Sequence, residues 1–200
     1  VTTSVAMMKV MEERGIHADV AAGLSLGEYC ALVAAGVMTA DDAIRTVRER
    51  GILMQEAVPA GVGGMSAVLG MTADEINAVV DEIPNVQVAN YNCPGQIVIS
   101  GLKEAVETAA VKLKEAGARR VIPLNVSGPF HSYLLEEAGE KLGRFLENIP
   151  VSEPKIPYVA NVTAAYVTKA EDVKPLLTRQ VSSSVRWQQS VETMLADGVD

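Results

Sequence analysis

The sequence predicts an α/β protein in which a parallel-sheet core carries a smaller unit as an insertion. Two observations support this prediction. Over residues 16–36, a short apolar run, a Gly-x-Ser-x-Gly turn and an Ala- and Leu-rich run follow one another, which is the order strand, turn, helix. Over residues 61–127, strand and helix patterns alternate at short intervals in the order βαββαβ, and the main domain resumes after them.

The composition excludes several classes of protein. The 200 residues are 48% hydrophobic and only 4% aromatic, which allows one main domain with a core of small aliphatic side chains. The formal net charge of −8 argues against nucleic acids and membrane surfaces as partners. Two cysteines, Cys30 and Cys93, do not make a disulfide framework, and a reducing cytoplasmic compartment fits them. No apolar run reaches membrane-spanning length, and no secretory signal pattern is present.

The first 60 residues belong to the core. The elements expected there are helix Thr3–Arg14, strand Ile16–Ala22, helix Leu26–Ala35 and a helix from residue 40 to about Ala57. Thr39 is a suitable N-cap for the last of these helices, Gly51 interrupts it and Pro59 ends it. The chain opens at Val1, without an initiator methionine and directly in a helical pattern, so we expect a fragment of a longer protein.

Residues 61–127 form the insertion. Its expected elements are strand Met65–Met71, helix Thr72–Ile83, strands Val86–Tyr91 and Gln96–Ser100, helix Leu102–Ala116 and strand Arg119–Val126. Thr72 and Glu75 have the spacing of a capping box, and the turn Asn92–Gly95 joins the two consecutive strands. The order βαββαβ is that of a ferredoxin-like subdomain.

The core resumes at residue 128. Its expected elements are helix Leu134–Asn148, an extended segment Pro154–Asn161, and helices Val173–Val181 and Val185–Ala196. Pro175 suits the first turn of its helix. Residues 1–60 and 128–200 together are then an incomplete core, and residues 61–127 are inserted into it.

The Gly-x-Ser-x-Gly turn makes Ser25 a candidate nucleophile. A sharp turn pushes its hydroxyl outward, and Gly23 and Gly27 remove side chains that would collide there. The N–H of Leu26, at the start of the following helix, points to where an oxyanion would form. Such an elbow is typical of a hydrolase-like α/β core, although the same pattern also occurs in ordinary flexible loops.

A serine nucleophile needs a base. The chain has two histidines, and His17 lies in or before the strand that leads to Ser25, where geometry disfavours it. We therefore assign His131, at the return to the core, as the base. No acidic residue has an obvious orienting position, so a Ser–His dyad and a full triad both stay open.

Two arginines, Arg48 and Arg50, lie near the end of the helix that follows the elbow helix. Most arginines in such positions belong to a solvated helix face. Arg50, however, precedes Gly51, and a kink there would turn it inward. A buried guanidinium beside a nucleophile would pair with a substrate carboxylate.

Five stretches together resemble one family, the malonyl-CoA:acyl carrier protein transacylases of bacterial type II fatty-acid synthesis. They span nearly the whole chain and are Gly23–Gly36 (GLSLGEYCALVAAG), Arg48–Pro59 (RERGILMQEAVP), Asn90–Gly101 (NYNCPGQIVISG), Ser127–Ser132 (SGPFHS) and Arg179–Gln189 (RQVSSSVRWQQ). The resemblance implies ping-pong transfer of a malonyl group from malonyl-CoA to the phosphopantetheine thiol of acyl carrier protein, through a malonyl-serine. It implies neither a metal nor a cofactor.

The resemblance also implies the site residues. Ser25 is the acylated nucleophile, His131 is its base, and Arg50 holds the malonyl carboxylate. The other implied residues are Leu26, whose amide is an oxyanion donor, Met54 and Phe130, which shape the pocket, and Gln180, whose backbone carbonyl orients His131 in place of an acid.

The sequence departs from the family pattern in several places. Leu24 stands where the family often has histidine, and Ser184 stands where proline is common, which predicts a looser loop. The family's N-terminal strand, its Gly-Gln-Gly-Ser-Gln loop with the second oxyanion donor, and its C-terminal Gly-Pro-Gly segment have no counterpart in these 200 residues. The alternative that these 200 residues alone have no transacylase activity therefore stays open.

Two other interpretations stay open. An α/β-hydrolase-type serine esterase or thioesterase shares the elbow, but it needs the chain order Ser, acid, His. The residues between Ser25 and His131 are largely taken up by the insertion, which disfavours it. The second alternative is a truncated, non-catalytic fragment that binds carrier protein and transfers nothing.

Overall fold

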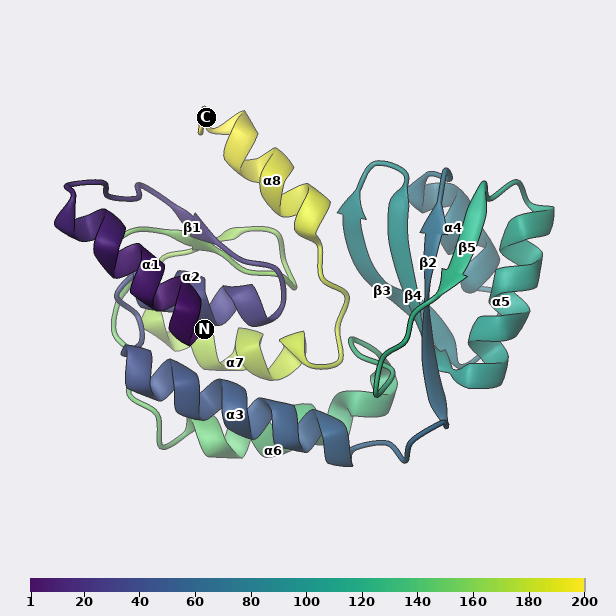
Figure 1. Cartoon of the computed structure of the whole chain (residues 1–200), viewed down its shortest axis with the longest axis horizontal. Coiled ribbons are helices and arrows are strands. Elements are labelled where there is room, and N and C mark those ends of the chain that lie inside the picture. Colours follow the sequence, from purple (N-terminus) through teal and green to yellow (C-terminus); the bar gives the residue numbers. More distant parts are fainter. Residues whose placement is uncertain (200) are drawn as a thin grey trace.

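The computed structural model describes residues 1–199 as two groups of elements that lie side by side (Figure 1). The helices are α1 Thr2–Glu13, α2 Leu26–Ala34, α3 Ala40–Glu56, α4 Ala73–Val80, α5 Lys103–Glu115, α6 Glu136–Leu146, α7 Ala170–Gln180 and α8 Trp187–Ala196, with a 3₁₀ turn η1 Tyr133–Leu135 before α6. The strands are β1 Ala21–Ala22, β2 Gly63–Leu69, β3 Val86–Cys93, β4 Gln96–Leu102, β5 Arg120–Pro123, β6 Tyr158–Val159 and β7 Tyr166–Val167. Within these residues no helix is both long and apolar enough to span a membrane.

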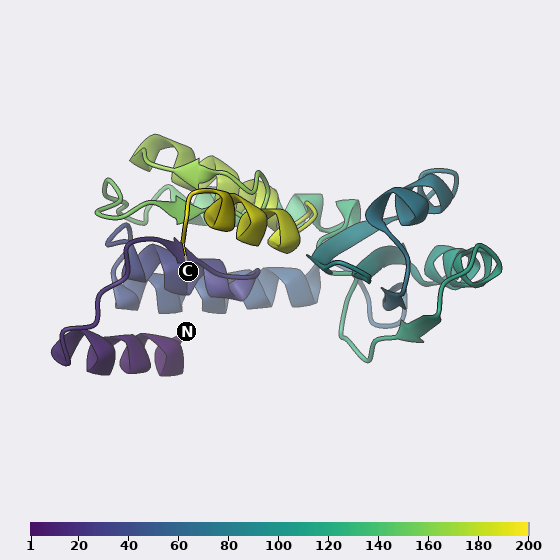
Figure 2. The same cartoon turned by 90° about the horizontal axis from the view of Figure 1, so that it is seen from above.

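The first group contains a small sheet with the strand order β1-β6-β7. Strand β1 pairs in parallel with β6, whereas β7 is antiparallel to β6. The helices α2, α3, α6 and α7 contribute to one apolar cluster with this sheet, which includes Tyr29, Leu32, Leu142, Tyr158 and Leu177. Helix α1 lies on the outer side, as Figure 2 shows, and buries only Val5.

Both core strands are shorter than the sequence predicts. The predicted strand Ile16–Ala22 is extended and paired only at Ala21–Ala22, and the predicted segment Pro154–Asn161 pairs only at Tyr158–Val159. Ile16 is 52% exposed and, with α1, lines a surface hollow, so its apolar side chain does not indicate a buried strand. The prediction was wrong there because an apolar side chain does not have to lie in a buried strand. Ile16 instead lies at the surface beside α1.

Helix α3 is continuous through Gly51, so the predicted interruption is wrong. A single glycine costs a helix about 1 kcal/mol relative to alanine, and the packed face of α3 outweighs that cost. Its buried residues, Ala43, Thr46, Arg50 and Met54, recur at helical spacing, so Arg50 faces inward by helix phase and not through a kink. The predicted N-cap is confirmed, because the Asp42 N–H donates to the Thr39 hydroxyl oxygen at 3.1 Å.

Pro175 lies inside α7 and not in its first turn, because the helix begins at Ala170. The sequence places the start of this helix three residues too late, at Val173. Proline has no N–H to donate within the helix, so α7 loses one backbone hydrogen bond at this position.

The second group is a four-stranded antiparallel sheet with the order β3-β4-β2-β5. With the helices α4 and α5, this is the strand order of a ferredoxin-like unit. The predicted capping box of Thr72 and Glu75 is confirmed. Both helices pack on one face of the sheet, while Met65, Ala67, Ala89 and Val98 on the other face contact Phe130 and Leu124. The predicted α/β class is confirmed, and the division at residues 60/61 and 127/128 stays a prediction.

A short segment after α7 joins the two groups. The Val185 N–H donates to Ala89 O at 2.8 Å, and the Tyr91 N–H donates to Val185 O at 2.9 Å, so Val185 pairs in parallel with the edge strand β3. The Ser184 hydroxyl donates to Val88 O. Ser184 therefore anchors this segment to β3, while the looser loop expected from the absent proline stays a prediction.

Ser184→Ala should lower the free energy of unfolding by about 1 kcal/mol, because it removes one partly buried hydrogen bond and leaves Val88 O with fewer donors. Urea denaturation measures the change. Ser152→Ala, at an exposed loop position, is the control and should change stability by less than about 0.5 kcal/mol. Equal stability of the two variants would contradict the role given to Ser184.

Candidate active site

Ser25 lies between β1 and α2 with φ 52° and ψ −102°, a backbone conformation that non-glycine residues rarely adopt. A Cβ on Gly23 would lie 2.1 Å from the backbone carbon and oxygen of Gly27, so the turn requires glycine at position 23. A Cβ on Gly27 would meet nothing within 4 Å, so the expected collision at that residue is not found. Of the two glycines in the motif, only Gly23 is therefore required by the close approach of the backbone. The elbow turns the Ser25 hydroxyl outward.

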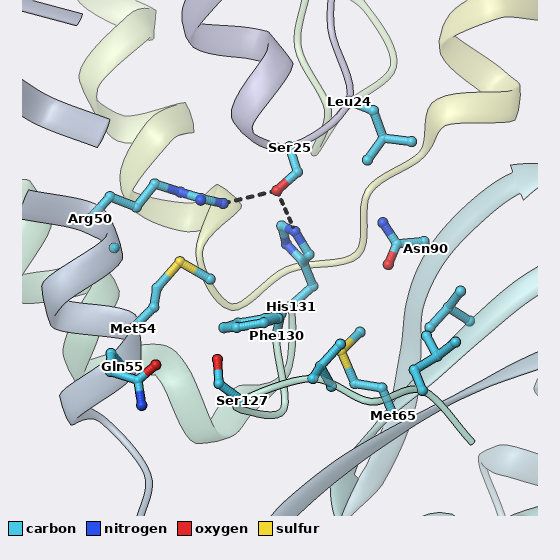
Figure 3. A pocket seen from close by; sticks show the side chains of 14 residues that line it. Leu24, Ser25, Arg50, Met54, Gln55, Met65, Asn90, Ser127, Phe130 and His131 are labelled. Carbon is cyan, nitrogen blue, oxygen red and sulfur yellow. Dashed lines mark hydrogen bonds between the residues drawn. The ribbon is translucent and has the colours of Figure 1, made fainter. Parts of the chain in front are cut away.

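His131 faces Ser25, and Figure 3 shows the contact. Ser25 Oγ lies 2.7 Å from His131 Nε2, and His131 Nδ1 lies 2.9 Å from Gln180 O. A carbonyl oxygen only accepts, so Nδ1 carries the proton and Nε2 accepts from the Ser25 hydroxyl. Burial, together with the charge of Arg50, lowers the pKa of His131 to about 4. The imidazole is therefore neutral and able to take a proton at pH 7.

Arg50 reaches the same hydroxyl from α3. Its Nη2 donates to Ser25 Oγ at 2.9 Å and to Gln180 Oε1 at 3.2 Å. The side chain is only 6% exposed, and its guanidinium carbon lies 5.8 Å from the centre of the Tyr29 ring. Burial lowers the Arg50 pKa from its ordinary value, but a guanidinium stays charged at pH 7. A cation thus lies directly beside the hydroxyl, while Arg48 is exposed on another face of α3.

These three side chains meet at a cavity of about 370 Å³ between the two groups of elements. Met54 and Phe130 line it, as do the backbone of Gly51 and several residues that sequence reasoning missed, namely Leu24, Gln55, Met65, Asn90, Val98, Leu124, Val126 and Ser127 (Figure 3). Met65, Asn90 and Val98 come from the four-stranded sheet. One wall of the cavity therefore belongs to the predicted insertion.

Leu26 does not line the cavity with its side chain, which is 43% exposed. As the first residue of α2 its N–H has no acceptor within the helix and lies next to Ser25. The Ser25 N–H is engaged elsewhere, because it donates to Asn161 Oδ1 at 2.6 Å.

Sequence reasoning also missed Glu28 and Asn161. Asn161 Nδ2 donates to Gly23 O at 2.7 Å, so this side chain holds both sides of the elbow. Glu28, on α2, is 1% exposed and accepts from Gln180 Nε2 at 2.7 Å and from the Asn161 N–H at 3.2 Å. The one available signal was an acidic residue among apolar ones on the elbow helix, three residues after Ser25.

No acidic side chain orients His131, since the acceptor at Nδ1 is the Gln180 carbonyl. Among residues 1–199, no group of three or more His, Cys, Asp or Glu side chains has the arrangement of a metal site. The arrangement can thus activate a serine by a neutral histidine and hold an anionic group beside it. His17 lies outside the cavity, on the surface next to α1.

The acyl transferase domain family matches the chain over residues 1–200. The malonyl CoA-acyl carrier protein transacylase of Bacillus subtilis is 48% identical over 99% of this chain, and that of Haemophilus influenzae is 46% identical over 98%. In each case the chain spans 64% of the relative's own length. The resemblance inferred from the five sequence stretches is therefore confirmed.

Solved structures give the same result. A malonyltransferase acting on acyl carrier protein from Vibrio cholerae has a TM-score of 0.95 and 44% identity, over 98% of this chain and 65% of that one. A malonyl-transacylase in complex with a type II polyketide acyl carrier protein matches with the same TM-score, identity and coverage. The transacylase of Clostridium perfringens has a TM-score of 0.96 at 39% identity, over 100% of this chain and 64% of that one.

Proposed function

The chain belongs to the acyl transferase domain family, and on that premise we propose that it transfers a malonyl group from malonyl-CoA to the phosphopantetheine thiol of an acyl carrier protein in fatty-acid biosynthesis. The observation that carries the proposal is the position of the Arg50 guanidinium, 2.9 Å from a serine hydroxyl that also contacts a neutral histidine. A serine esterase has no need of a cation there, whereas a malonyl group carries a carboxylate. The reaction needs no metal and no cofactor, and a cytoplasmic location belongs to the same proposal.

In the proposed first half-reaction, His131 Nε2 takes the proton of Ser25 as Oγ attacks the thioester carbonyl of malonyl-CoA. The carbon–sulfur bond then breaks, and the coenzyme A sulfur takes up the proton. In the second half-reaction the carrier thiol gives its proton to His131 and attacks the malonyl ester, and Ser25 leaves with a proton. This is ping-pong acyl transfer by a Ser–His dyad.

The remaining residues have supporting roles in this proposal. The Leu26 N–H stabilises the oxyanion, and one such donor contributes about 3 kcal/mol to transition-state stabilisation. Met54 and Phe130 shape the pocket around the malonyl carbons. The Gln180 carbonyl keeps the His131 proton on Nδ1, so that Nε2 is the base. Residues 1–60 and 128–200 form the catalytic core in this proposal, and residues 61–127 are the insertion that completes the pocket wall.

A direct test uses the chain with malonyl-CoA, first alone and then with a phosphopantetheinylated acyl carrier protein. The proposal expects a malonyl-enzyme by intact mass and loss of that mass when the carrier is added, with malonyl-carrier as product. Free malonate as the main product, with or without the carrier, would indicate the esterase alternative. Carrier binding without any acylation of the chain would indicate the non-catalytic alternative.

Arg50→Ala should reduce malonyl transfer by about 2–5 kcal/mol in transition-state free energy, because the malonyl carboxylate then enters a buried site without a partner. Acetyl transfer should stay the same or rise, since an acetyl group has no carboxylate and the buried cation is gone. The measurement is kcat/KM for both thioesters. Arg48→Ala, on an exposed face of the same helix, should change neither. Equal losses for both thioesters in Arg50→Ala would make Arg50 a structural residue only.

A further inference from the structure

Glu28 is a buried carboxylate that the proposed reaction does not use. It lies on α2, three residues after Ser25, and is 1% exposed. None of the ion pairs found within residues 1–199 includes it. Its Oε2 accepts two hydrogen bonds, from Gln180 Nε2 at 2.7 Å and from the Asn161 N–H at 3.2 Å, while its buried Oε1 has no hydrogen-bond partner.

Gln180 is the residue through which Glu28 reaches the active site. Its Nε2 also donates to Ser25 O at 3.0 Å, its Oε1 accepts from Arg50 Nη2 at 3.2 Å, and its backbone oxygen lies 2.9 Å from His131 Nδ1. This one residue, fully buried at the end of α7, thus contacts the nucleophile, the arginine and the base.

We propose that Glu28 is a positioning residue, which fixes the orientation of the Gln180 side-chain amide and thereby holds Arg50 toward Ser25. An amide turned by 180° exchanges a donor for an acceptor. In the turned orientation Gln180 Oε1 would face the accepting oxygen of Glu28, and Nε2 would face the donating Nη2 of Arg50. Both contacts would be repulsive. Together with Ser25 O, which also accepts from Nε2, the accepting oxygen on Glu28 therefore favours the orientation in which Arg50 has an acceptor and its guanidinium points at the serine.

The role requires an accepting oxygen and not a full charge. Burial raises the Glu28 pKa to about 7, against the opposing effects of its hydrogen bonds and of Arg50. The other titratable groups around it are Tyr29 on the same helix and Tyr158 on β6, whose pKa values burial raises above the ordinary value, so both are neutral. When Glu28 takes up a proton, the unpartnered Oε1 can carry it and Oε2 still accepts from Gln180.

Two substitutions of similar volume separate this role from packing and from charge. Glu28→Gln keeps an accepting oxygen and loses the charge, whereas Glu28→Met loses both. We expect Glu28→Met to lower kcat/KM for malonyl transfer about 10–100-fold and to lower the malonyl-to-acetyl ratio, because Arg50 loses its orientation. Glu28→Gln should stay within about threefold of the unchanged chain. The same two substitutions at Glu140, exposed on α6, are the matched controls.

This inference rests on the proposed function, so a second measurement is independent of activity. The side-chain amide resonances of Gln180 in ¹⁵N NMR, assigned by their loss in Gln180→Met, report the hydrogen bond to Glu28 directly. They should move much further in Glu28→Met, which loses the acceptor, than in Glu28→Gln, which loses only the charge. If the unchanged chain transfers neither thioester, the proposed function fails, and the NMR comparison alone decides the role of Glu28. Unmoved Gln180 resonances in Glu28→Met would overturn the inference, as would equal losses of transfer in the Gln and Met variants.

Discussion

Ser25→Ala should abolish the proposed acylation of the chain by malonyl-CoA, which is the largest effect that we expect of any substitution. Ser25 Oγ is the atom on which the contacts of His131 and Arg50 converge, at 2.7 Å and 2.9 Å. Alanine keeps the elbow backbone but removes the oxygen atom that would form the ester bond in the proposed reaction. The loss should be complete and not partial, because no other hydroxyl of the chain contacts both His131 and Arg50 among the described residues 1–199.

Intact mass after incubation with malonyl-CoA measures this effect. The unchanged chain and the control Ser152→Ala, at an exposed loop position, should gain one malonyl group. Ser25→Ala should gain none at any incubation time, and circular dichroism should confirm that it is folded. Malonyl label that persists in the folded Ser25→Ala chain would remove Ser25 from the role of nucleophile.

His131→Ala should slow acylation by a factor of roughly 10²–10⁴, as the loss of a general base does. The Nε2 atom of this residue accepts from the Ser25 hydroxyl, and the Gln180 carbonyl holds its tautomer. Its pKa is lowered to about 4, so the imidazole is neutral above that pH and protonated below it. The contribution of this residue should therefore be constant from about pH 5 upward and should disappear as the pH falls through about 4.

Rapid-quench measurements of the first acylation step, over a range of pH, test the base. His17→Ala is the matched control, because His17 is exposed and lies outside the cavity. A near-normal acylation rate for His131→Ala at neutral pH would show that another group takes the proton. A rate that rises between pH 5 and pH 7 in the unchanged chain would show that the pKa of the base is not lowered.

The parts of the molecule that follow from local patterns were predictable. The elbow around Ser25 has a fixed spacing, Thr39 and Thr72 cap helices through bonds to residues three positions away, and the βαββαβ order determines a ferredoxin-like sheet. The pairing of Ser25 with His131 followed from the small number of histidines. Arg50 was assigned correctly to the inward face, but for the wrong reason, since helix phase and not a kink at Gly51 turns it.

Apart from the pairing of Ser25 with His131, the contacts between distant segments were not predictable from the residue patterns. Asn161 holds the elbow from 136 residues away, and the Gln180 side chain reaches Ser25 from 155 residues away. No local pattern distinguishes such polar residues from surface ones. The same applies to Ser184, whose hydroxyl donates to β3 from 96 residues away, and to the short pairing of β1 with β6, which has no periodic signal of its own.

The parallel pairing of Ala21 with Tyr158 has a consequence for the order in which the chain folds. Contacts close in sequence form faster than distant ones, because each distant contact must first close a loop. The sheet β3-β4-β2-β5 and the helices α4 and α5 lie within one continuous stretch, residues 63–123, so they can associate before either half of the surrounding core has its partner. Hydrogen exchange during refolding should show β2–β4 protected ahead of β1. On a ribosome, α2 and α3 are synthesised before α6, β6 and α7, so the parts of their apolar faces that pack against these later elements stay exposed until the later elements have left the exit tunnel.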